Sequence, residues 1–437
     1  MPRLDLPWRD PAAVADALAA AHGQEGLVWL DGDGSRLGKQ VLLAADPLEQ
    51  LCCRGRPGDP GARDPFAALR QIQRRGHGHW LGWIGYEAAA WVEPADHWQA
   101  SDMASLWAAR HDPVLRFDLP ARRCWLEGSD AGRTARWAEL VEQTPPVAGP
   151  EAEGAVIPGE GWHWHTDAAA YGAGVERIRR WIAAGDLFQA NLTACCERHL
   201  AEPPNPLALY RRFRRACPAP FAGLAIAGGE ARGEAVLSAS PERFLRLEAE
   251  GVVETRPIKG TRPRHADPDQ DAAAAADLVC SAKDRAENVM IVDLLRNDLG
   301  RVCRPGSIEV SQLLGLESFR HVHHLTSVVR GRLRPGLGAA DLLRACWPGG
   351  SVTGAPKVRA CRRLNELEPV PRGPYCGSLF HLDPAGALDS NLLIRSVMVK
   401  GSRLRLHAGG GIVADSDPQA EATEMGWKIR PLLEALT

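Results

Sequence analysis

The sequence predicts an α+β fold, because segments that resemble strands occur in runs and only a few helical segments separate them. Short apolar segments mark the candidate strands: 27–30, 80–86, 188–193, 235–240, 244–247, 252–258, 320–329, 377–382, 392–400 and 403–408. Repeated βαβ units would instead alternate single strands with helical patterns of about 10–15 residues. The order of the segments therefore favours α+β over an α/β fold.

The helical segments carry recognisable end signals. Four apolar side chains recur at helical spacing ahead of Gly185, which stands where a C-cap is expected: Tyr171, Val175, Ile178 and Ile182. Residues 268–299 are helical in pattern, and Ser281 followed by Asp284 resembles a capping box that begins a second helix there. A last helix is expected to begin at residues 417–418, where an aspartate is followed by a proline.

Composition and charge exclude several classes of protein. Of 437 residues, 45% are hydrophobic and 24% are charged, which excludes wholesale disorder. Lys and Arg (52) nearly balance Asp and Glu (54), so the net charge of −2 gives no support for binding to nucleic acid or an anionic membrane. The eleven cysteines form no C-x-x-C pair, the N-terminus resembles no signal peptide, and no apolar run reaches about 18 residues. We expect a soluble protein of the reducing cytoplasm.

Two parts of the chain are separated by a segment rich in proline, glycine and acidic side chains. This segment, residues 144–161, predicts a linker or a long surface loop. It divides residues 1–143 from residues 162–437, which carry most of the motifs that suggest chemistry. No internal repeat of fixed period is present, so a repeat architecture is excluded.

Glu242 and Lys259 form the first candidate pair. The dipeptide at 250–251 (Glu-Gly) is typical of a two-residue hairpin turn, because glycine readily adopts the positive φ that the turn needs. That register places Glu242 opposite Lys259, with Cβ atoms about 5 Å apart. The pair is either a salt bridge on a solvated face or an acid and an amine that flank one substrate. The amine is a nucleophile only if desolvation or a nearby cation lowers its pKa.

Two helices carry carboxylates that could hold a metal ion. Asp284 and Glu287 are three residues apart on one predicted helix, and Glu421, Glu424 and Lys428 share a face of the last one. If the helices converge, their oxygens suit Mg²⁺, which takes one or two carboxylates plus waters and substrate oxygens. The alternative is that both are ordinary solvated helix faces.

Glycines and one arginine indicate a place for an anion. Residues 409–411 are consecutive glycines after a strand, and their N–H groups could form an anion nest or simply a turn. Residues 349–357 lack the spacing of a phosphate loop. Arg395 lies in an apolar predicted strand and would need an anionic partner, such as a ligand carboxylate, if it were buried. The histidines of segment 321–324 have no nearby Cys or Glu to complete a zinc set.

Seven ordered motifs lie between about residues 172 and 430: 185–193 (GDLFQANLT), 240–244 (SPERF), 256–261 (RPIKGT), 283–288 (KDRAEN), 292–298 (VDLLRND), 348–357 (PGGSVTGAPK) and 408–413 (AGGGIV). The motif at 81–87 (LGWIGYE) extends this set toward the N-terminus. Together they resemble the chorismate-utilising enzymes, a family that includes anthranilate synthase component I and the isochorismate and salicylate synthases. The resemblance implies two large antiparallel β-sheets packed face to face with helices outside, in a sandwich that both parts of the chain share.

The resemblance also implies a reaction. Lys259 would attack ring carbon 2 of chorismate while Glu242, as general acid, protonates the departing 4-hydroxyl. Ammonia would then displace the lysine to give 4-amino-4-deoxychorismate, on the route to 4-aminobenzoate and folate. Relatives that add water carry a lysine where this chain has Gln189, and anthranilate synthases carry alanine where it has Lys259. The alternatives are anthranilate synthesis and a non-catalytic metabolite-binding regulator, which would not need the carboxylate set.

By the same resemblance, Glu287 and Glu424 are Mg²⁺ ligands, with Asp284 and Glu421 in supporting positions. Seven residues would contact the substrate, the first five its anionic groups and the last two its ring: Tyr375, Arg395, Gly410, Gly411, Lys428, His324 and Ser351. Ammonia would come from a separate glutaminase subunit in a heterodimer, because no nucleophilic cysteine with histidine and glutamate partners is identifiable in the sequence.

Overall fold

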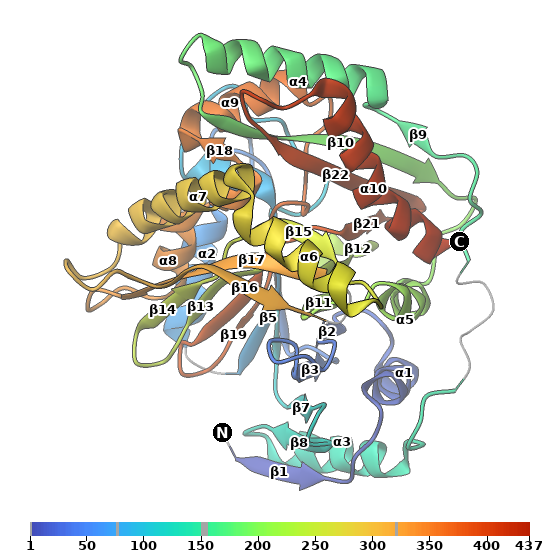
Figure 1. Cartoon of the computed structure of the whole chain (residues 1–437). Coiled ribbons are helices and arrows are strands. Elements are labelled where there is room, and N and C mark those ends of the chain that lie inside the picture. Colours follow the sequence, from blue (N-terminus) through green and yellow to red (C-terminus); the bar gives the residue numbers. More distant parts are fainter. Residues whose placement is uncertain (1, 76–77, 150–155, 320–321) are drawn as a thin grey trace.

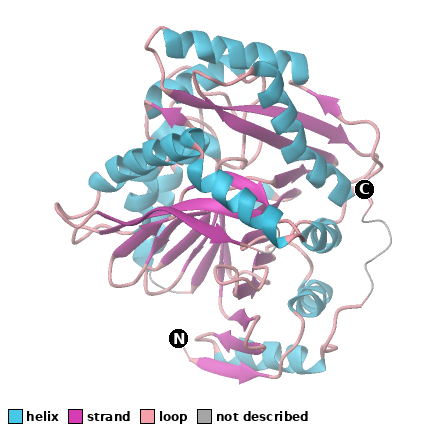
Figure 2. Cartoon of the chain, viewed as in Figure 1, coloured by secondary structure: helices cyan, strands magenta, loops and turns pink. Residues whose placement is uncertain are grey.

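A computed structural model describes residues 2–75, 78–149, 156–319 and 322–437 (Figure 1). Within these residues the strands form two large sheets in which neighbouring strands pair antiparallel. Helices lie outside the sheets, and Figure 2 shows them over the strands. The predicted α+β fold with two antiparallel sheets is confirmed.

The larger sheet has twelve strands within the described residues. Their spatial order is β1 (Arg3–Leu6), β8 (Arg123–Glu127), β7 (Val114–Asp118), β3 (Gln40–Ala44), β2 (Val28–Asp31), β11 (Phe221–Ile226), β12 (Glu234–Ser240), β21 (Ser396–Lys400), β22 (Arg403–Ile412), β10 (Gln189–His199) and β18 (Gly354–Ala355), with β9 (His163–Trp164) beside β10. Strands from either side of residues 144–161 therefore share this sheet.

The smaller sheet has ten strands in the same described part of the chain. Their order is β15 (Ile258–Pro263), β17 (Val322–Arg332), β14 (Val252–Thr255), β13 (Arg243–Leu247), β20 (Leu388–Asn391), β19 (Ser378–Leu382), β5 (His79–Ile84), β6 (Leu106–His111) and β4 (Glu49–Cys53), with β16 (Glu309–Ser318) beside β17. Here too, early strands (β4, β5 and β6) pair within one sheet with late ones.

Helices cover the faces that the sheets do not bury against each other. They are α1 (Pro11–His22), α2 (Pro65–Arg75), α3 (Ala131–Gln143), α4 (Ala168–Ala183), α5 (Pro206–Ala216), α6 (Pro268–Cys280), α7 (Ala282–Gly300), α8 (Ala339–Cys346), α9 (Lys357–Leu367) and α10 (Pro418–Leu436), with short 3₁₀ turns η1 (Tyr86–Trp91), η2 (Gly229–Ala231) and η3 (Gly350–Val352). In Figure 1, α4 and α10 lie over β10 and β22, while α6 and α7 lie over β15 and β17. Among the described helices, none combines the length and apolarity needed to cross a bilayer.

The core has two layers, because side chains of the larger sheet alternate between its faces. In β2, Val28 packs in the cluster shared with the smaller sheet, while Trp29 packs in the cluster beneath the helices. In β12, Val236 and Leu237 divide in the same way. Each such buried side chain contributes about 1.5–3 kcal/mol to folding. The larger sheet is therefore held between the smaller sheet and a helical layer.

The helix ends follow the predicted signals. The Ser281 hydroxyl accepts a hydrogen bond from the Asp284 amide at 3.3 Å and caps α7. The Asp417 carboxylate accepts one from the Ala420 amide at 2.8 Å and caps α10. Gly185 follows α4 with φ of 76°, the left-handed conformation that glycine adopts readily. The two helices that carry the candidate metal ligands thus begin where the sequence predicts.

The predicted hairpin register is wrong by one residue. The turn between β13 and β14 has three residues instead of two, since the Glu248 amide donates to the Val252 carbonyl at 2.8 Å across it. Leu247 consequently pairs with Val253. Gly251 does take a positive φ, 83°, but at the end of the longer turn. The length of the turn, which the Glu-Gly pair did not reveal, sets the register.

A second difference separates Glu242 from Lys259 in the sheet. β14 ends before Pro257, which has no amide hydrogen to continue a ladder, and Lys259 lies in β15. β15 pairs with β17, whereas Glu242 precedes β13. The two residues are therefore not cross-strand partners, and their side chains come together through the loop described below.

Other expectations also need revision. Residues 409–411 do not follow a strand but lie inside β22, opposite residues 191–193 of β10. Glycine permits this, because a Cβ at Gly409 would strike the backbone of β10. Arg395 lies before β21 with φ of 50°, a left-handed conformation that excludes it from an extended strand. His321 and residues 150–155 of the expected linker lie outside the described residues.

Candidate active site

Ser351 joins the side chains of Glu242 and Lys259. Its hydroxyl donates to Oε1 of Glu242 at 2.9 Å, and its carbonyl oxygen accepts from Nζ of Lys259 at 3.3 Å. Ser351 lies in η3, Lys259 in β15 and Glu242 in the link from β12 to β13. An amine and a carboxyl group from different elements thus meet at one point, as the sequence predicted but by a different route.

The Glu242 carboxyl is poised to hold a proton near neutral pH. It is only 6% exposed. Burial raises its pKa to about 7, although the Ser351 hydrogen bond, the charge of Lys259 and the Ile258 amide each act to lower it. A carboxyl group with such a pKa is present in both protonation states near pH 7, which suits a general acid.

Gly410 lies where β22 passes beneath α10. A Cβ here would lie 3.3 Å from Oε2 of Glu421 and 3.4 Å from Nζ of Lys428. Lys428 also donates to the Gly409 carbonyl at 2.9 Å and pairs with Glu424 at 2.8 Å. Because Gly410 has no side chain, the strand backbone lies directly beside the Lys428 ammonium. A backbone with a cation next to it suits an anionic ligand.

Gly411 occupies the matching position beside α7 and β10. A Cβ on it would collide with the side-chain amide of Gln189 and lie 3.7 Å from Oε2 of Glu287. Gln189 is 1% exposed, and its Oε1 atom has no hydrogen-bond partner within the described part of the chain. A buried acceptor without a partner is costly unless a ligand supplies the donor.

The acidic faces of α7 and α10 converge around Lys283. Its ammonium lies 3.4 Å from Oε1 of Glu421, and the charges of Glu287 and Glu424 act with that of Glu421 to raise its pKa. Oε1 of Glu421 also accepts from the Ser416 hydroxyl at 2.7 Å. The predicted metal-ligating carboxylates therefore do share one region, but with a lysine that the sequence analysis did not assign.

Glu287 and Glu424 differ in their electrostatics. Burial raises the pKa of Glu287, more than the neighbouring Lys259 and Lys283 lower it. Burial acts in the same sense on Glu424, but the charge and hydrogen bond of Lys428, together with the charges of Lys283 and Lys259, outweigh it and lower its pKa. The positive charges near Glu287 therefore do not fully compensate for its burial. A bound divalent cation would add positive charge and lower its pKa.

This donor set fits a magnesium ion. The described residues contain no group of three or more Asp, Glu, His and Cys side chains arranged to hold a metal. Mg²⁺ does not require one, because it commonly takes one or two carboxylates and completes its octahedron with waters and substrate oxygens. Glu287 and Glu424 supply that number. Asp284 instead pairs with Arg262 at 3.2 Å and packs against Gly260, beside Lys259.

His324 and Arg395 flank the same region. Nδ1 of His324 shares a hydrogen bond with the Thr261 hydroxyl at 2.9 Å, and burial lowers the pKa of the imidazole to about 4, so the ring is neutral at pH 7. The positive charge of Arg395 contributes to this shift. Within the described residues, the Arg395 guanidinium has no hydrogen bond or ion pair, so all its donors are available to a ligand carboxylate.

Tyr375 is the predicted residue least connected to the others. Its buried ring stacks on His407, with centroids 5.0 Å apart and planes at 13°. Sequence reasoning missed three residues near the site: Lys283, Thr261 and Arg372. Lys283 and Thr261 lie in recognised motifs and Arg372 lies in none. A lone Lys, Thr or Arg gives no signal of its partner when that partner is distant in the chain.

Comparisons with known proteins agree with this geometry. The profile of the chorismate binding enzyme family matches residues 39–434. Aminodeoxychorismate synthase component 1 of Klebsiella aerogenes is 37% identical over 457 aligned residues, which cover 99% of this chain and 98% of that protein. Anthranilate synthase component 1 of Streptomyces coelicolor is 38% identical over 412 residues, 87% of this chain and 79% of that one.

The fold comparison leads to the same family. The crystal structure of anthranilate synthase component I from Streptococcus pneumoniae matches with a TM-score of 0.77 at 29% identity, covering 91% of this chain and 93% of that one. The chain belongs to the chorismate binding enzyme family. The resemblance inferred from the seven motifs is therefore confirmed, and with it the two-sheet fold.

Proposed function

We propose that this protein converts chorismate and ammonia to 4-amino-4-deoxychorismate, the activity named for its Klebsiella relative. The observation that carries the proposal is the contact of Lys259 and Glu242 with one serine, Ser351. A nucleophilic amine and a carboxyl group that holds a proton near pH 7 are the two groups that an allylic displacement of hydroxide requires.

The chemistry divides into two allylic displacements. In its neutral form, Nζ of Lys259 bonds to ring carbon 2, the two conjugated ring double bonds shift, and the bond from carbon 4 to the hydroxyl breaks. Glu242 gives its proton to the departing hydroxyl, which leaves as water. Ammonia then bonds to carbon 4, both double bonds shift back and the bond to Lys259 breaks. A proton from the new ammonium restores Glu242, so the sum is chorismate plus ammonia giving product plus water.

We assign Mg²⁺ to Glu287 and Glu424, with Asp284 and Glu421 supporting them. When bound, the ion supplies positive charge for a ring carboxylate. The protein's own part is to bring Glu287 of α7 beside Gly411 and Glu421 of α10 beside the adjacent Gly410. The raised pKa of Glu287 supports the assignment, because this carboxylate lacks compensation from its protein neighbours.

The remaining groups suit the substrate's two carboxylates and ring. Arg395 offers a guanidinium that has no hydrogen bond or ion pair among the described residues, and Lys428 with the backbone of Gly410 offers a second cationic surface. Tyr375 completes the set proposed for the anionic groups. His324, neutral at pH 7, and Ser351 are proposed to line the ring.

We infer that ammonia reaches this chain from a glutaminase partner in the cytoplasm. The name of the Klebsiella relative, component 1, implies a second component. All eleven cysteines are unpaired thiols, which fits a reducing compartment. We also propose that residues 1–143 and 162–437 act as one unit, joined by residues 144–161, because strands from both parts lie in each sheet.

Anthranilate synthesis is the second candidate, favoured by the similarity to the Streptomyces and Streptococcus proteins. Product analysis separates the two. The purified chain is incubated with chorismate, ammonium and Mg²⁺, and the products are resolved by chromatography and mass. We expect 4-amino-4-deoxychorismate. Fluorescent anthranilate as the main product would replace this proposal with the second candidate.

A further inference from the structure

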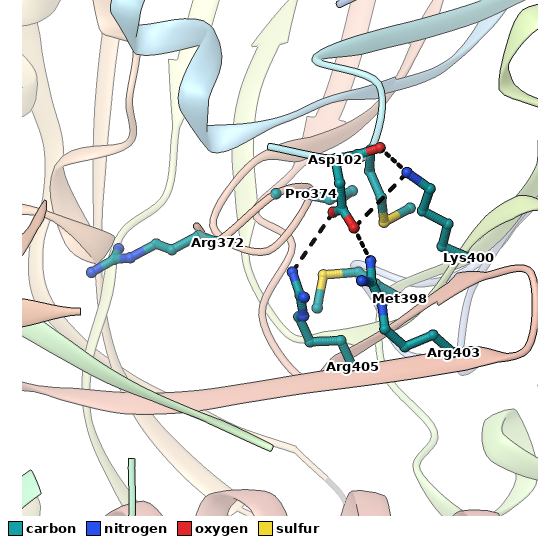
Figure 3. A pocket seen from close by; sticks show the side chains of 9 residues that line it. Asp102, Arg372, Pro374, Met398, Lys400, Arg403 and Arg405 are labelled. Atoms are coloured by element: carbon teal, nitrogen blue, oxygen red, sulfur yellow. Dashed lines mark hydrogen bonds and ion pairs between the residues drawn. The ribbon is translucent and has the colours of Figure 1, made fainter. Parts of the chain in front are cut away.

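Arg372 is a buried cation to which neither the sequence analysis nor the proposed reaction assigns a role. Its side chain is 1% exposed. Its backbone borders the small cavity around Asp102, but Figure 3 shows its side chain extending away from that cluster. The guanidinium lies over the ring of Tyr86, 4.5 Å from its centroid. A charge so deeply buried must be compensated by its hydrogen bonds.

Two of those bonds reach backbone carbonyls that flank the active site. Nη1 donates to the Val352 carbonyl at 2.8 Å, one residue beyond Ser351. Nη2 donates to the Asn191 carbonyl at 2.7 Å, on the strand that pairs with Gly411. Arg372 therefore connects the loop that holds Glu242 and Lys259 to the strand beneath the proposed substrate.

The charge is balanced by Glu368, which strengthens the same connection. Nε donates to Oε2 of Glu368 at 2.8 Å and Nη2 to Oε1 at 2.6 Å. Oε1 of Glu368 also accepts from the Thr193 amide at 3.0 Å, on the same strand, β10. The planar fork thus makes four hydrogen bonds in fixed directions, which a lysine ammonium could not reproduce.

We propose that Arg372 is a positioning residue, whose guanidinium fixes the Ser351 loop against β10 so that Ser351 holds the Glu242 carboxyl in place for proton transfer. The inference rests on the proposed function, because it assumes that Glu242 acts as the acid. Arg372 itself contacts none of the reacting groups; it acts through the Val352 and Asn191 carbonyls.

The test is Arg372→Lys, which keeps the charge but not the fork. Chorismate consumption is followed as a function of pH, whatever product forms, with saturating ammonium and Mg²⁺. We expect kcat to fall about 10- to 100-fold, the scale of a displacement near 1 Å, with a smaller change in KM. Because the Ser351 bond helps to lower the pKa of Glu242, its loss should move the alkaline limb of the profile to higher pH.

The other groups that face Glu242, namely Lys259 and the Ile258 amide, remain in both proteins. Ser351→Ala should shift the alkaline limb in the same direction. In the double variant, Arg372→Lys with Ser351→Ala, the two shifts should not add, because both substitutions remove the same hydrogen bond, from Ser351 to Glu242. Additive shifts would mean that Arg372 does not act through Ser351.

Arg214→Lys is the matched control. Arg214, on α5, is a less deeply buried guanidinium that also forms a fork-like pair, to Asp31 at 2.5 and 3.2 Å. We expect a lower Tm for this variant with an unchanged pH profile and kcat. If Arg372→Lys behaves in that way, the residue is purely structural and the proposal is overturned.

A second variant keeps the proposal testable if Arg372→Lys does not fold. Glu368→Asp retains both charges but shortens the acid, which draws the guanidinium away from the two carbonyls. The same shift of the alkaline limb is expected, and an unchanged limb at reduced Tm would overturn the proposal. The wild-type product decides the proposed function separately, since chorismate consumption is read out independently of the product.

Discussion

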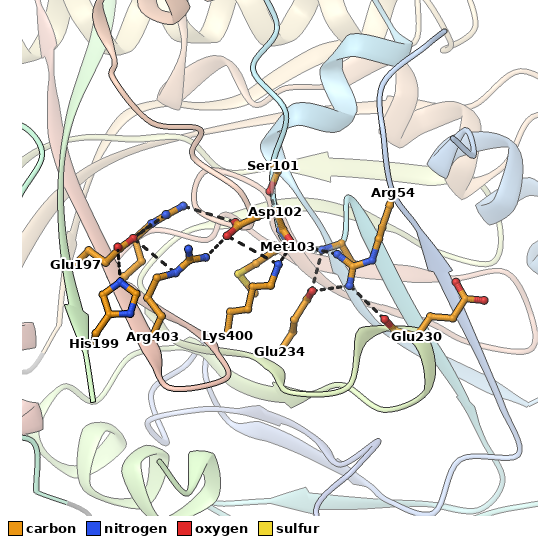
Figure 4. Close-up of polar contacts among 12 residues, drawn as sticks. Arg54, Ser101, Asp102, Met103, Glu197, His199, Glu230, Glu234, Lys400 and Arg403 are labelled. Atoms are coloured by element: carbon orange, nitrogen blue, oxygen red, sulfur yellow. Dashed lines mark hydrogen bonds and ion pairs between the residues drawn. The ribbon is translucent and has the colours of Figure 1, made fainter. Parts of the chain in front are cut away.

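Glu242 and Asp102 are two carboxylates that each face basic side chains, one for Glu242 and three for Asp102, yet their pKa values shift in opposite directions. Burial raises the pKa of Glu242 to about 7, against a serine, a single lysine and one amide. Burial acts on Asp102 too, but Arg403, Arg405 and Lys400 together outweigh it and lower its pKa. Figure 3 shows these three cations gathered around Asp102, and Figure 4 shows Lys400 and Arg403 there.

Both regions lie along β22, so the same strand serves two purposes. Its first residues supply Arg403 and Arg405 to the Asp102 cluster, and its glycine end supplies Gly410 and Gly411 to the candidate active site. At the usual strand rise, Arg405 and Gly410 lie about 17 Å apart, and Arg403 and Gly411 about 27 Å. The difference teaches that the charge of Asp102 is compensated within the protein, whereas burial outweighs the neighbouring positive charges at Glu242 and Glu287 of the candidate active site.

The largest effect is expected for Lys259→Arg, which preserves a cation but removes the nucleophile. A guanidinium keeps its proton at neutral pH and cannot bond to carbon. We expect kcat to fall on the order of 10⁴-fold or more, as for other covalent nucleophiles. Steady-state assay of chorismate consumption checks this, with circular dichroism to confirm folding. Substantial activity would make Lys259 an electrostatic group like the cations around Asp102.

Glu242→Gln should reduce kcat about 10²- to 10⁴-fold while chorismate still binds, because the amide cannot donate an acidic proton. It should also change the pH dependence of stability. The folded-state pKa of about 7 exceeds the ordinary 4.5, so the wild type loses stability as pH rises between these values. The variant lacks this loss, and its Tm relative to the wild type should rise from about pH 5 to about pH 8.

An equal Tm difference at both pH values would show that Glu242 is not a raised-pKa carboxyl. A kcat within a few-fold of the wild type would make it a structural partner of Ser351. Either outcome would remove the contrast with Asp102.

A smaller effect on turnover, but a large one on metal dependence, is expected for Glu424→Gln. Chelation with EDTA should abolish wild-type activity and added Mg²⁺ should restore it. The variant should need much more Mg²⁺, since one of the two proposed ligand carboxylates is lost, and calorimetric titration with Mg²⁺ measures this directly. Full activity of the wild type in EDTA would contradict the metal assignment.

Asp102→Asn should have the smallest effect on catalysis. We expect kcat near that of the wild type and a loss of about 1 kcal/mol in unfolding free energy, because the side chain is partly exposed and its pairs are screened. A lowered pKa means that the contribution is present at neutral pH and is lost as pH falls through the folded-state value. Urea unfolding at about pH 7 and pH 3 checks this. A large loss of kcat would place Asp102 in the catalytic machinery.

Much of the fold could be predicted from the sequence, because helix ends depend on residues that are close together in the chain. Ser281 and Asp417 mark their helix starts because a capping side chain bonds to an amide three residues away. The predicted register between β13 and β14 was wrong, because one extra turn residue shifts every later pair by one position. The Glu-Gly dipeptide fits turns of either length. Local hydrogen bonds are encoded within a few residues, whereas register is not.

The candidate site shows the same division. Glu242 and Lys259 were paired through an incorrect register, yet they do meet, because Ser351 from a third segment joins them. Arg372 could not be found in this way. Its partners Val352 and Asn191 are backbone carbonyls 20 and 181 residues away, and no side-chain pattern marks a carbonyl.

The most direct test of the central claim is intact-mass analysis of the protein after incubation with chorismate and Mg²⁺ in the absence of ammonia. The first displacement should then stall at the covalent stage. We expect an adduct with the mass of one chorismate less one water on the wild type, located to Lys259 by peptide mapping and missing from Lys259→Ala. No adduct on the wild type under any quench, together with an active Lys259→Arg, would contradict the covalent mechanism.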